Sequence, residues 1–346
     1  MIRLGALTEA PPIPPPELVA RIGGTCDNYL EIGLTQRRIL ESLLPSDWSF
    51  EGKSVLDFGC GCGRTLSAFL PDGERAEFVG CDIHADTIAW ANSELSPPFS
   101  FFVCNEAPPL AQPDHRFDSV YGMSVFSHIT DQWSHWLVEL HRVMRPGAIA
   151  VISVLGPVAA ARLVGVDWDD RIGMASIDFQ KGWEVGGPSA LLADWWVREH
   201  WGRAFEILEF FDCPDDWFAH DFVVMRKREV GVTADQLEAV DLGDPREYAA
   251  VACNVGILQG QQRALGEQLR EAQRGAQLKE GDMAQTVRRL TEQVERQTTE
   301  LERLNGLLNV IAGSRSWRLT KPLRRATAIA GKQRPSHQDV GATPRQ

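Results

Sequence analysis

Short apolar runs alternate with amphipathic stretches along the first two thirds of the chain. The apolar runs predict strands near residues 53–58, 77–82, 99–104, 117–122 and 148–154. The amphipathic stretches predict helices near residues 63–70, 84–93 and 132–144. This alternating order is typical of a parallel sheet covered by helices on both faces. Residues 204–211 and 218–225 predict a closing β-hairpin, so we expect an α/β fold with a doubly wound, mostly parallel sheet of seven strands.

The first 34 residues are expected to form a separate N-terminal arm and lid. Its sequence PPIPPPE predicts an extended conformation, because successive prolines do not continue a helix or a sheet ladder. Short helices are expected at 17–22 and 35–44, with a turn at 29–33 between them. The domain that contains the sheet should then occupy residues 35–228.

The C-terminal third is rich in Gln, Glu, Arg and Leu. After a linker at 229–255, a seven-residue repeat over 256–312 predicts a long C-terminal coiled-coil helix. Its a positions are Val287, Val294, Leu301 and Leu308, and its d positions are Met283, Leu290, Leu304 and Ile311, with Gln297 interrupting d. An upstream frame of Leu258, Leu265, Leu269, Ala272 and Ala276 is shifted near Gly275 and Gly281, so we expect two pieces. The alternative is a single amphipathic helix folded back onto the domain.

Residues 54–66, SVLDFGCGCGRTL, join a predicted buried strand to a helix through a loop that contains Gly59, Gly61 and Gly63. Glycines let the backbone turn tightly and lie directly against a ligand. Asp57 precedes this loop and Asp82 ends the next strand, where a doubly wound sheet would bring both acids to one crevice. A dinucleotide would need the spacing G-x-G-x-x-G, and its phosphates would be repelled by the acid. The observed D-x-G-x-G-x-G spacing suits a cationic ligand better.

This stretch resembles motif I of the class I S-adenosylmethionine-dependent methyltransferases, whose ligand carries a sulfonium and an ammonium. Residues 117–153 resemble the fourth strand, following helix and Pro-Gly turn of the bacterial branches that modify small molecules and sugars. Arg145, Pro146 and Gly147 would end that helix. The resemblance implies a Rossmann-like methyltransferase fold, with S-adenosyl-L-methionine as the cofactor.

The resemblance also implies a set of residues that bind the cofactor. They are Asp57, Gly59, Cys60, Gly61, Gly63, Asp82, Ile83, Asn105, Glu106 and Ser124. Asp82 would accept hydrogen bonds from the ribose, and Asn105 and Glu106 would contact the adenine, unless they only cap a loop. Arg64 would hold the cofactor carboxylate or simply start its helix. Since the segment before the first strand closes over the cofactor in related enzymes, Tyr29 is either a lid contact or a packing residue beneath the sheet.

His128 follows the fourth strand, where a methyl acceptor should lie, and its imidazole could take the proton from an attacking hydroxyl. The alternative is a histidine that caps a helix or is hydrogen-bonded in the core. His200 and His220 are weaker candidates for the same role. Residues 155–203 interrupt the alternation and could form substrate walls or fill the core with their tryptophans, Trp168, Trp183, Trp195, Trp196 and Trp201.

The composition argues against several classes of function. A net charge of −12 disfavours nucleic-acid binding, which needs a basic face. Seven cysteines without paired zinc-like spacing predict reduced thiols and no metal site, because the glycine loop already explains Cys60 and Cys62. No apolar stretch reaches the roughly 18 residues of a membrane-spanning helix, and the first residues lack the pattern of a secretion signal. We therefore expect a soluble, cytoplasmic protein.

The C-terminal tail, 313–346, is basic, and we expect it to be partly disordered. Its segment SRSWRLTKPLRR, 314–325, is similar to the ends of many bacterial enzymes that build or modify surface polysaccharides. This similarity implies a glycan or glycolipid acceptor, with a small metabolite or a non-catalytic scaffold as alternatives. The tail could also bind anionic lipid, or a partner of polysaccharide assembly, at the inner face of the membrane. Valine at a and leucine at d favour a parallel dimer, so a homo-oligomer is expected.

Overall fold

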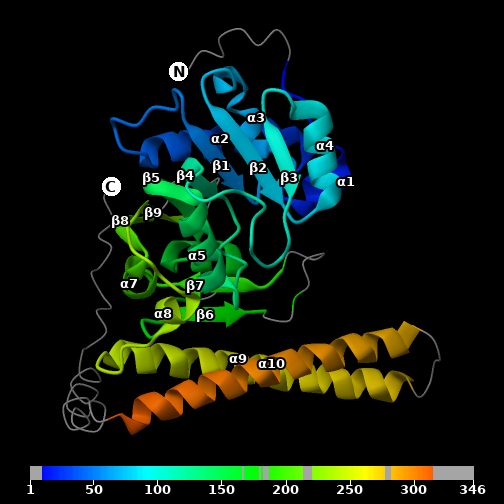
Figure 1. Cartoon of the computed structure of the whole chain (residues 1–346). Helices are drawn as coiled ribbons and strands as arrows, with labels where there is room; N and C mark the ends of the chain where they lie inside the picture. The colour runs from blue at the N-terminus through cyan, green and yellow to red at the C-terminus, as the bar shows by residue number, and fades with distance from the viewer. Residues whose placement is uncertain are drawn as a thin grey trace, which may run out of the picture.

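The computed structural model describes residues 10–165, 167–178, 181, 187–212, 220–276 and 282–314. A seven-stranded sheet in the order β3-β2-β1-β4-β5-β9-β8 forms the centre of the molecule (Figure 1). The strands are β1 (Ser54–Phe58), β2 (Glu77–Asp82), β3 (Ser100–Val103), β4 (Phe117–Gly122), β5 (Met144–Val154), β8 (Phe205–Phe211) and β9 (Asp221–Lys227). The first five are parallel, and β9 runs antiparallel to both β5 and β8. The predicted doubly wound, mostly parallel sheet is confirmed.

Helices cover both faces of this sheet because each face is apolar. The helices of the first 165 residues are α1 (Pro16–Arg21), α2 (Tyr29–Leu43), α3 (Arg64–Ser67), α4 (Ala85–Leu95), α5 (Trp133–Val143) and α6 (Pro157–Ala159). Helices α2, α3 and α4 share one core cluster with the sheet, whereas α5 packs in the cluster on the opposite face. On α5, Leu137, Leu140 and Val143 are fully buried, as their helical spacing predicts.

The prediction of a turn at 29–33 is wrong. These residues are the first turn of α2, which begins directly after a short 3-10 helix, η1 (Cys26–Asn28). The backbone N–H of Thr25 donates to the Asn28 side chain at 2.7 Å, which caps the start of η1. Since Tyr29 is buried, the helix gains an apolar contact in its first turn, and the helical conformation is favoured over a turn.

The Pro-Gly sequence after α5 is a bulge within β5 and not a turn before it. The strand begins at Met144, which pairs with Phe117, and the next pair along β4 is Ser119 with Ile149. Residues 145–148 therefore lie opposite a single residue of β4, and Gly147 supplies the positive φ of 71° that the extra residues require. The expectation that α5 ends at this point is confirmed, but the strand starts earlier than predicted.

A smaller unit lies between β5 and β8. It contains a short π-helix after α6, η3 (Ala160–Val164), and a two-stranded antiparallel sheet of β6 (Met174–Ile177) and β7 (Ser189–Leu192). Helix α7 (Asp194–His200) and the short 3-10 helix η5 (Trp201–Arg203) follow. Trp201 is fully buried against Phe126, with ring centroids 5.2 Å apart, so this unit is anchored in the core of the main domain.

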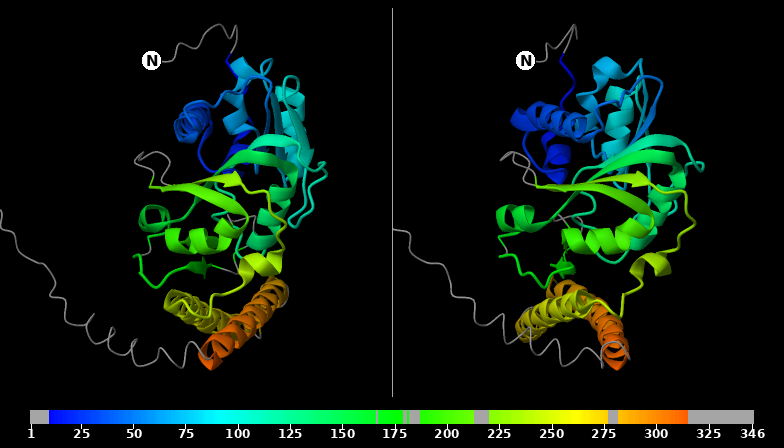
Figure 2. Two further views of the ribbon diagram at one scale, coloured as in Figure 1. Left: turned by 60° about the vertical axis from the view of Figure 1, so that its left-hand side comes forward. Right: turned by 90° about the vertical axis from the view of Figure 1, so that its left-hand side faces the viewer.

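Two long helices pack against each other below this unit, after the short helix α8 (Ala234–Glu238). They are α9 (Pro245–Ala276) and α10 (Asp282–Gly313), and all views show them lying side by side across the bottom of the domain (Figures 1 and 2). Leu301, Leu304 and Ile311 of α10 are buried in one cluster with Val255 and Leu258 of α9. The heptad residues of the second half of α10 are thus covered within one chain, and the two helical pieces agree with the prediction. A coiled coil between chains stays a prediction.

The helical pair also folds back onto the domain. Asn254 of α9 accepts a hydrogen bond from the backbone N–H of Ser176 in β6 at 3.0 Å, and both groups are buried. Because α9 begins at Pro245, the predicted linker 229–255 contains α8 and the first turns of α9. Trp183, Cys213 and the tail from residue 315 onward lie outside the described residues. In the part of the chain that is described, no helix is both long and apolar enough to cross a membrane.

Candidate functional site

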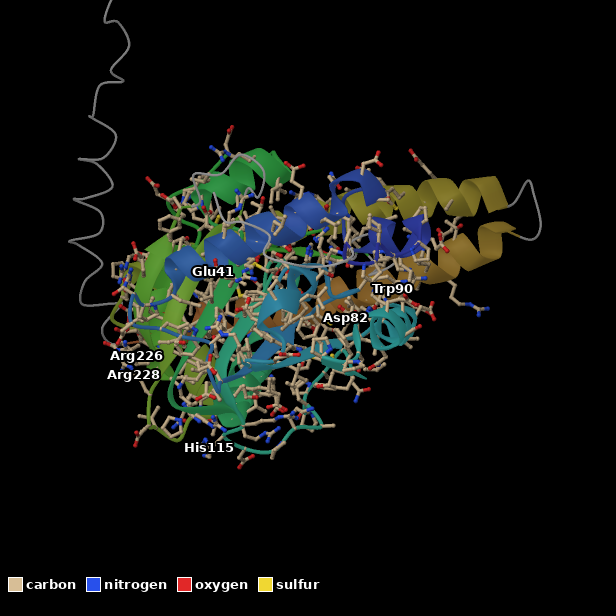
Figure 3. All side chains as sticks on the ribbon, turned by 90° about the horizontal axis from the view of Figure 1, so that it is seen from above. Glu41, Asp82, Trp90, His115, Arg226 and Arg228 are labelled. Atoms are coloured by element: carbon tan, nitrogen blue, oxygen red, sulfur yellow. The ribbon has the colours of Figure 1, made fainter. Side chains whose placement is uncertain are left out.

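A cavity of about 460 Å³ opens at the carboxyl ends of β1, β2 and β4. Asp57 with the glycine loop, Asp82 and Ser124 line it from these three strands, as the strand order predicts. Residues 20–23, at and just after the end of α1, also line it. Viewed from above, Asp82 lies between the sheet and α4, far from Arg226 and Arg228 on the opposite side (Figure 3). The candidate residues of consecutive strands therefore meet at one crevice.

The glycine loop is held close to the sheet by hydrogen bonds. The backbone N–H groups of Gly59 and Cys60 both donate to the carbonyl of Cys81 at 2.9 Å. Gly59 has a φ of 78°, and a Cβ at this position would lie 2.2 Å from a methyl of Val125. Gly61, with a φ of 54°, would place a Cβ 2.5 Å from a methyl of Ile22 in the arm. Both positions therefore require glycine, because the loop is packed between two cavity walls.

The other residues of this loop have packing roles. Gly63 is the N-cap residue of α3 and does not line the cavity. Cys60 lines the cavity, and burial raises the pKa of its thiol well above the usual value, as an unreactive packing cysteine requires. Within the described ranges, no group of three or more His, Cys, Asp or Glu side chains is placed to hold a metal ion.

Asp82 presents a carboxylate whose orientation is fixed. One oxygen accepts from the N–H of Gly61 and the other from the N–H of His84, each at 2.9 Å. A carboxylate offers about four acceptor positions. Since only one backbone donor is bound to each oxygen, the side chain retains acceptor capacity toward the cavity that it lines. Two neighbouring hydroxyl groups of a ligand would match that capacity.

Asp57 is almost completely buried at the end of β1, where it lines the same cavity. Burial raises its pKa to about 8, because a charged carboxylate is poorly solvated there; the Tyr121 hydroxyl opposes the rise, and the Asp82 charge adds to it. Its Oδ2 atom has no hydrogen-bond partner among the described residues. A buried carboxyl of this kind favours a cationic ligand.

Arg64 connects the glycine loop to the arm. Its guanidinium donates to the carbonyls of Gly23 at 2.5 Å and Ile22 at 3.0 Å, and burial lowers its pKa. Arg64 also lines the cavity and is the first residue of α3. Of the two predicted roles, the start of the helix is confirmed, and the side chain has an additional role that the sequence did not reveal. It holds residues 22 and 23 over the crevice.

Tyr29 lies behind the glycine loop and not in the cavity. Its hydroxyl donates to the carbonyl of Cys62 at 3.1 Å, and the side chain is fully buried. Burial raises the pKa of this hydroxyl well above its usual range, so it stays protonated. The packing interpretation therefore describes Tyr29 better than the lid contact.

Some of the residues that follow β2 and β3 line the cavity, and others do not. Ile83, Cys104 and Glu106 line the cavity, whereas Asn105 is exposed and does not line it. Met123 and Val125, on either side of Ser124, contribute apolar walls that the sequence did not predict. A flat aromatic base could lie between these apolar groups.

His128 lines the cavity at the end that lies beyond β4. Its Nδ1 is 2.7 Å from the carbonyl oxygen of Pro188. Burial lowers the pKa of His128, so the ring is neutral near pH 7. Because a carbonyl can only accept, Nδ1 carries the proton and Nε2 is the acceptor nitrogen of this tautomer. This is the tautomer that a general base needs.

A second histidine lies near this end of the cavity. His220 Nε2 is 3.0 Å from the hydroxyl of Ser124, and burial lowers the pKa of His220 to about 4. Ser124 has a positive φ of 58°, and its N–H donates to the Ser153 hydroxyl at 2.7 Å. A non-glycine residue held in this strained conformation is often part of a functional site. The sequence analysis gives His220 as a weaker candidate for the base, whereas its imidazole lies next to a residue that lines the cavity.

His200 and the tryptophans of the insertion have structural roles. His200 is buried against Glu247, away from the main cavity, and Trp196 stacks on its ring at 4.3 Å. Trp168, Trp195, Trp196 and Trp201 do not line the cavity; all four belong to or pack on the core around α5. The tryptophan that does line it is Trp136 of α5. For these four residues the core interpretation is confirmed.

Comparison with known proteins agrees with this geometry. Residues 55–147 match a family model described as "Methyltransferase domain". Fatty-acid O-methyltransferase of Mycolicibacterium smegmatis is 34% identical over 97 residues, which cover 28% of this chain and 35% of that protein. A ubiquinone biosynthesis O-methyltransferase of Bradyrhizobium sp. is 34% identical over 106 residues, which cover 30% and 40%.

A further relative is phthiotriol/phenolphthiotriol dimycocerosates methyltransferase 1 of Mycobacterium ulcerans, 31% identical over 106 residues that cover 31% of this chain and 39% of that protein. The chain therefore spans between 35% and 40% of the length of these three relatives. The matched segment contains the glycine loop, Asp82 and His128. Residues 55–147 are thus similar to a methyltransferase domain, which agrees with the resemblance of the sequence motifs.

Proposed function

We propose that this chain transfers the methyl group of S-adenosylmethionine to a hydroxyl, or to an amine, of an acceptor that binds beside His128. The observation that supports this most is the arrangement of the cavity. Asp57, Asp82 and the glycine loop form one end of it, and His128 with a neutral, acceptor Nε2 forms the other. A crevice that is open and lined in this way argues against a scaffold without catalytic function.

The residues present fit S-adenosylmethionine. Asp82 has acceptor capacity for the two ribose hydroxyls, and Asp57 lines the same cavity, where its carboxylate would attract a cationic group. Ile83 and Glu106 would contact the adenine. When bound, the cofactor supplies a methyl carbon that is electrophilic because it is attached to a sulfonium. The remaining chemistry is the deprotonation and orientation of the acceptor.

His128 would perform the deprotonation. Its Nε2 would take the proton from the acceptor hydroxyl as the oxygen attacks, while the Pro188 carbonyl stabilises the imidazolium through the Nδ1 hydrogen bond. Arg64 would hold the arm over the crevice and so exclude water. The Ser124 and His220 pair would shape the wall next to the reacting oxygen.

Two classes of acceptor have support. We propose a glycan or glycolipid of bacterial surface-polysaccharide biosynthesis, because residues 314–325 are similar to the ends of enzymes in that process. The alternative is a smaller, apolar metabolite, since relatives are named for fatty acids and for ubiquinone biosynthesis. A homo-oligomer formed through the C-terminal helices, and contact of the basic tail with lipid or with an assembly partner, are further proposals. Light scattering of the full chain tests the oligomer.

The proposed function predicts the effect of Asp82→Ala. The variant should bind S-adenosylmethionine about 10-fold to 100-fold more weakly, because the ribose hydroxyls lose a buried acceptor worth roughly 1–3 kcal/mol. Isothermal calorimetry measures the affinity directly. Asp47→Ala, which removes an exposed carboxylate before β1, is the matched control and should leave the affinity unchanged. Equal affinity in Asp82→Ala and wild type would contradict the site, and absence of binding in the wild type would contradict the function.

The raised pKa of Asp57 predicts a pH-dependent affinity for the cofactor. In the free protein Asp57 is mostly protonated below about pH 8, and a cationic ligand favours its ionised form. Binding at pH 7 should therefore release close to one proton, and the affinity should rise as the pH is raised toward 8. Calorimetry in two buffers with different heats of ionisation measures this proton release, which should vanish in Asp57→Asn.

A rise in pH, which strengthens cofactor binding, has the opposite effect on the contribution of Asp57 to folding stability. The usual pKa of 3.8 applies to the unfolded chain, so between pH 4 and pH 8 the folded protein holds a proton that the unfolded chain has released. The contribution of Asp57 to stability is thus fully present at low pH and falls as the pH rises through this range. A cofactor affinity that is independent of pH would show that Asp57 does not face the cation.

A further inference from the structure

A second hollow adjoins the cofactor cavity. It is a groove of about 760 Å³ between the segment that follows β4 and helix α10. His128, Ile129, Trp136 and Glu106 line both the groove and the cavity. Figures 1 and 2 show α10 running beneath the domain on the side where α5 lies. His128 therefore stands where the two hollows meet, which is the position at which an acceptor has to present its hydroxyl group.

One face of α10 forms the far wall of this groove. The lining residues of α10 are spaced by three or four positions, which places them on a single face: Arg289, Glu292, Gln293, Arg296, Thr299 and Glu300. The neighbouring face packs on α9 through Leu290, Leu301 and Leu304, which are buried. The polar face is therefore not needed for the packing of the two helices, and every residue on it has a side chain that can donate or accept hydrogen bonds.

The groove contains both signs of charge. Arg289, Arg296 and Lys181 form no ion pair with a described residue, and the carboxylates of Glu106, Asp131 and Glu292 line the same groove. Glu300 is paired with Arg303 at 2.8 Å. Apolar lining is confined to Ala107, Ile129, Trp136 and Pro188, none of which belongs to α10. Donors and acceptors are thus interspersed along the wall.

This chemistry discriminates between the two classes of acceptor. An alkyl chain in the groove would remove charged and amide groups from water without replacing their hydrogen bonds, which is unfavourable. Vicinal hydroxyls can accept from arginine and lysine and donate to carboxylates at the same time. A site built from such groups favours a hydroxyl-rich ligand strongly over one that lacks hydroxyls.

We propose that this groove is the acceptor site, that its occupant is a glycan, and that Arg289 and Arg296 of α10 hold it with one hydroxyl directed at His128. The inference rests on the proposed methyltransferase function and adds to it a role for the C-terminal helices. They contribute a wall of the substrate site. The experiment distinguishes this proposal from two alternatives, which are an apolar acceptor and an acceptor that does not contact α10.

The experiment uses the full chain, S-adenosylmethionine and two sets of acceptors: short oligosaccharides of mannose, rhamnose, galactose and glucose, and palmitate. Release of S-adenosylhomocysteine is the readout. We expect turnover on an oligosaccharide and not on palmitate. Arg289→Ala/Arg296→Ala should raise the acceptor KM about tenfold or more through the loss of two charge-assisted hydrogen bonds. Its kcat and its affinity for S-adenosylmethionine should stay within about twofold of wild type.

Arg288→Ala is the matched control, because Arg288 is an exposed neighbour on the same helix and does not line the groove. Thr299→Trp, which fills the groove without removing a charge, should also raise the KM. Thermal melting verifies that each variant is folded. Turnover on palmitate, no turnover on either set, or an unchanged KM in the double variant would overturn the inference. If the wild-type protein does not bind S-adenosylmethionine, the proposed function itself is overturned.

Discussion

His128→Ala is expected to lower turnover about 100-fold or more, while S-adenosylmethionine binds with nearly unchanged affinity. The variant removes the nitrogen that accepts the proton from the attacking hydroxyl, and general-base catalysis typically contributes at least this factor. In the wild type, burial holds the pKa of His128 below its usual value, so the rate should reach its plateau below neutral pH. The variant should lose this acidic limb of the pH profile. Single-turnover kinetics across pH measures both effects.

His135→Ala provides the control for this experiment, because His135 is an exposed histidine on α5 that does not line the cavity. His220→Ala tests the second histidine and should have a smaller effect, since the His220 imidazole contacts the Ser124 hydroxyl. A His128→Ala protein with a lower melting temperature but normal turnover in its folded fraction would show that His128 only supports the loop next to Pro188. The acceptor would then need a different base, or none.

The sheet and the cofactor crevice could be predicted because they depend on local patterns. Buried parallel strands have continuous apolar runs, and the glycine loop must follow the first of them, so Asp57 and Asp82 could be assigned to one crevice before the fold was known. The start of β5 could not be predicted. Arg145, Pro146 and Gly147 near its start are polar or break regular structure, and they belong to the strand only because β4 pairs around the bulge at Gly147.

The contacts made by the N-terminal arm and by α10 could not be predicted for a different reason. Arg64 reaches the carbonyl of Gly23 across a separation of 41 residues, and nothing in the local sequence of either segment indicates that contact. The heptad pattern likewise shows which face of α10 is buried, but it does not show whether the partner is α9 or a second chain. The polar face of α10 had no pattern that would assign it to a substrate site.

Gln297 illustrates this limit of the heptad pattern. It interrupts the d positions and is completely buried, and its side-chain amide donates to Gln261 of α9 at 3.4 Å. Gln261 in turn donates to the carbonyl of Ser176 in β6 at 3.1 Å. A buried polar residue in a heptad commonly fixes the register of its partner helix. Here the chain of hydrogen bonds fixes α10 to α9, and α9 to the domain, within one molecule.

A buried ion pair makes a second connection between the domain and the helices. His200 of α7 lies 3.0 Å from a carboxylate oxygen of Glu247 in α9 and 2.7 Å from the carbonyl of Leu237 in α8. When Glu247 is ionised, both partners of the ring are hydrogen-bond acceptors, and each ring nitrogen lies within hydrogen-bond distance of one of them. Each side chain is at most 3% exposed. Loss of one partner would leave the other charge buried without compensation.

Glu247→Ala is therefore expected to lower the free energy of unfolding by about 3–5 kcal/mol, the usual cost of removing one member of a buried pair. Glu247→Gln should cost less, because its amide oxygen still accepts from His200. Glu199→Ala is the matched control, since Glu199 pairs with Arg246 between the same two helices at 3.6 Å but at the surface, where such pairs contribute about 0–1 kcal/mol. Urea unfolding followed by the fluorescence of the tryptophans, among them Trp196 stacked on His200, measures these losses. Equal, small losses in Glu247→Ala and Glu199→Ala would show that the buried pair does not connect the C-terminal helices to the domain.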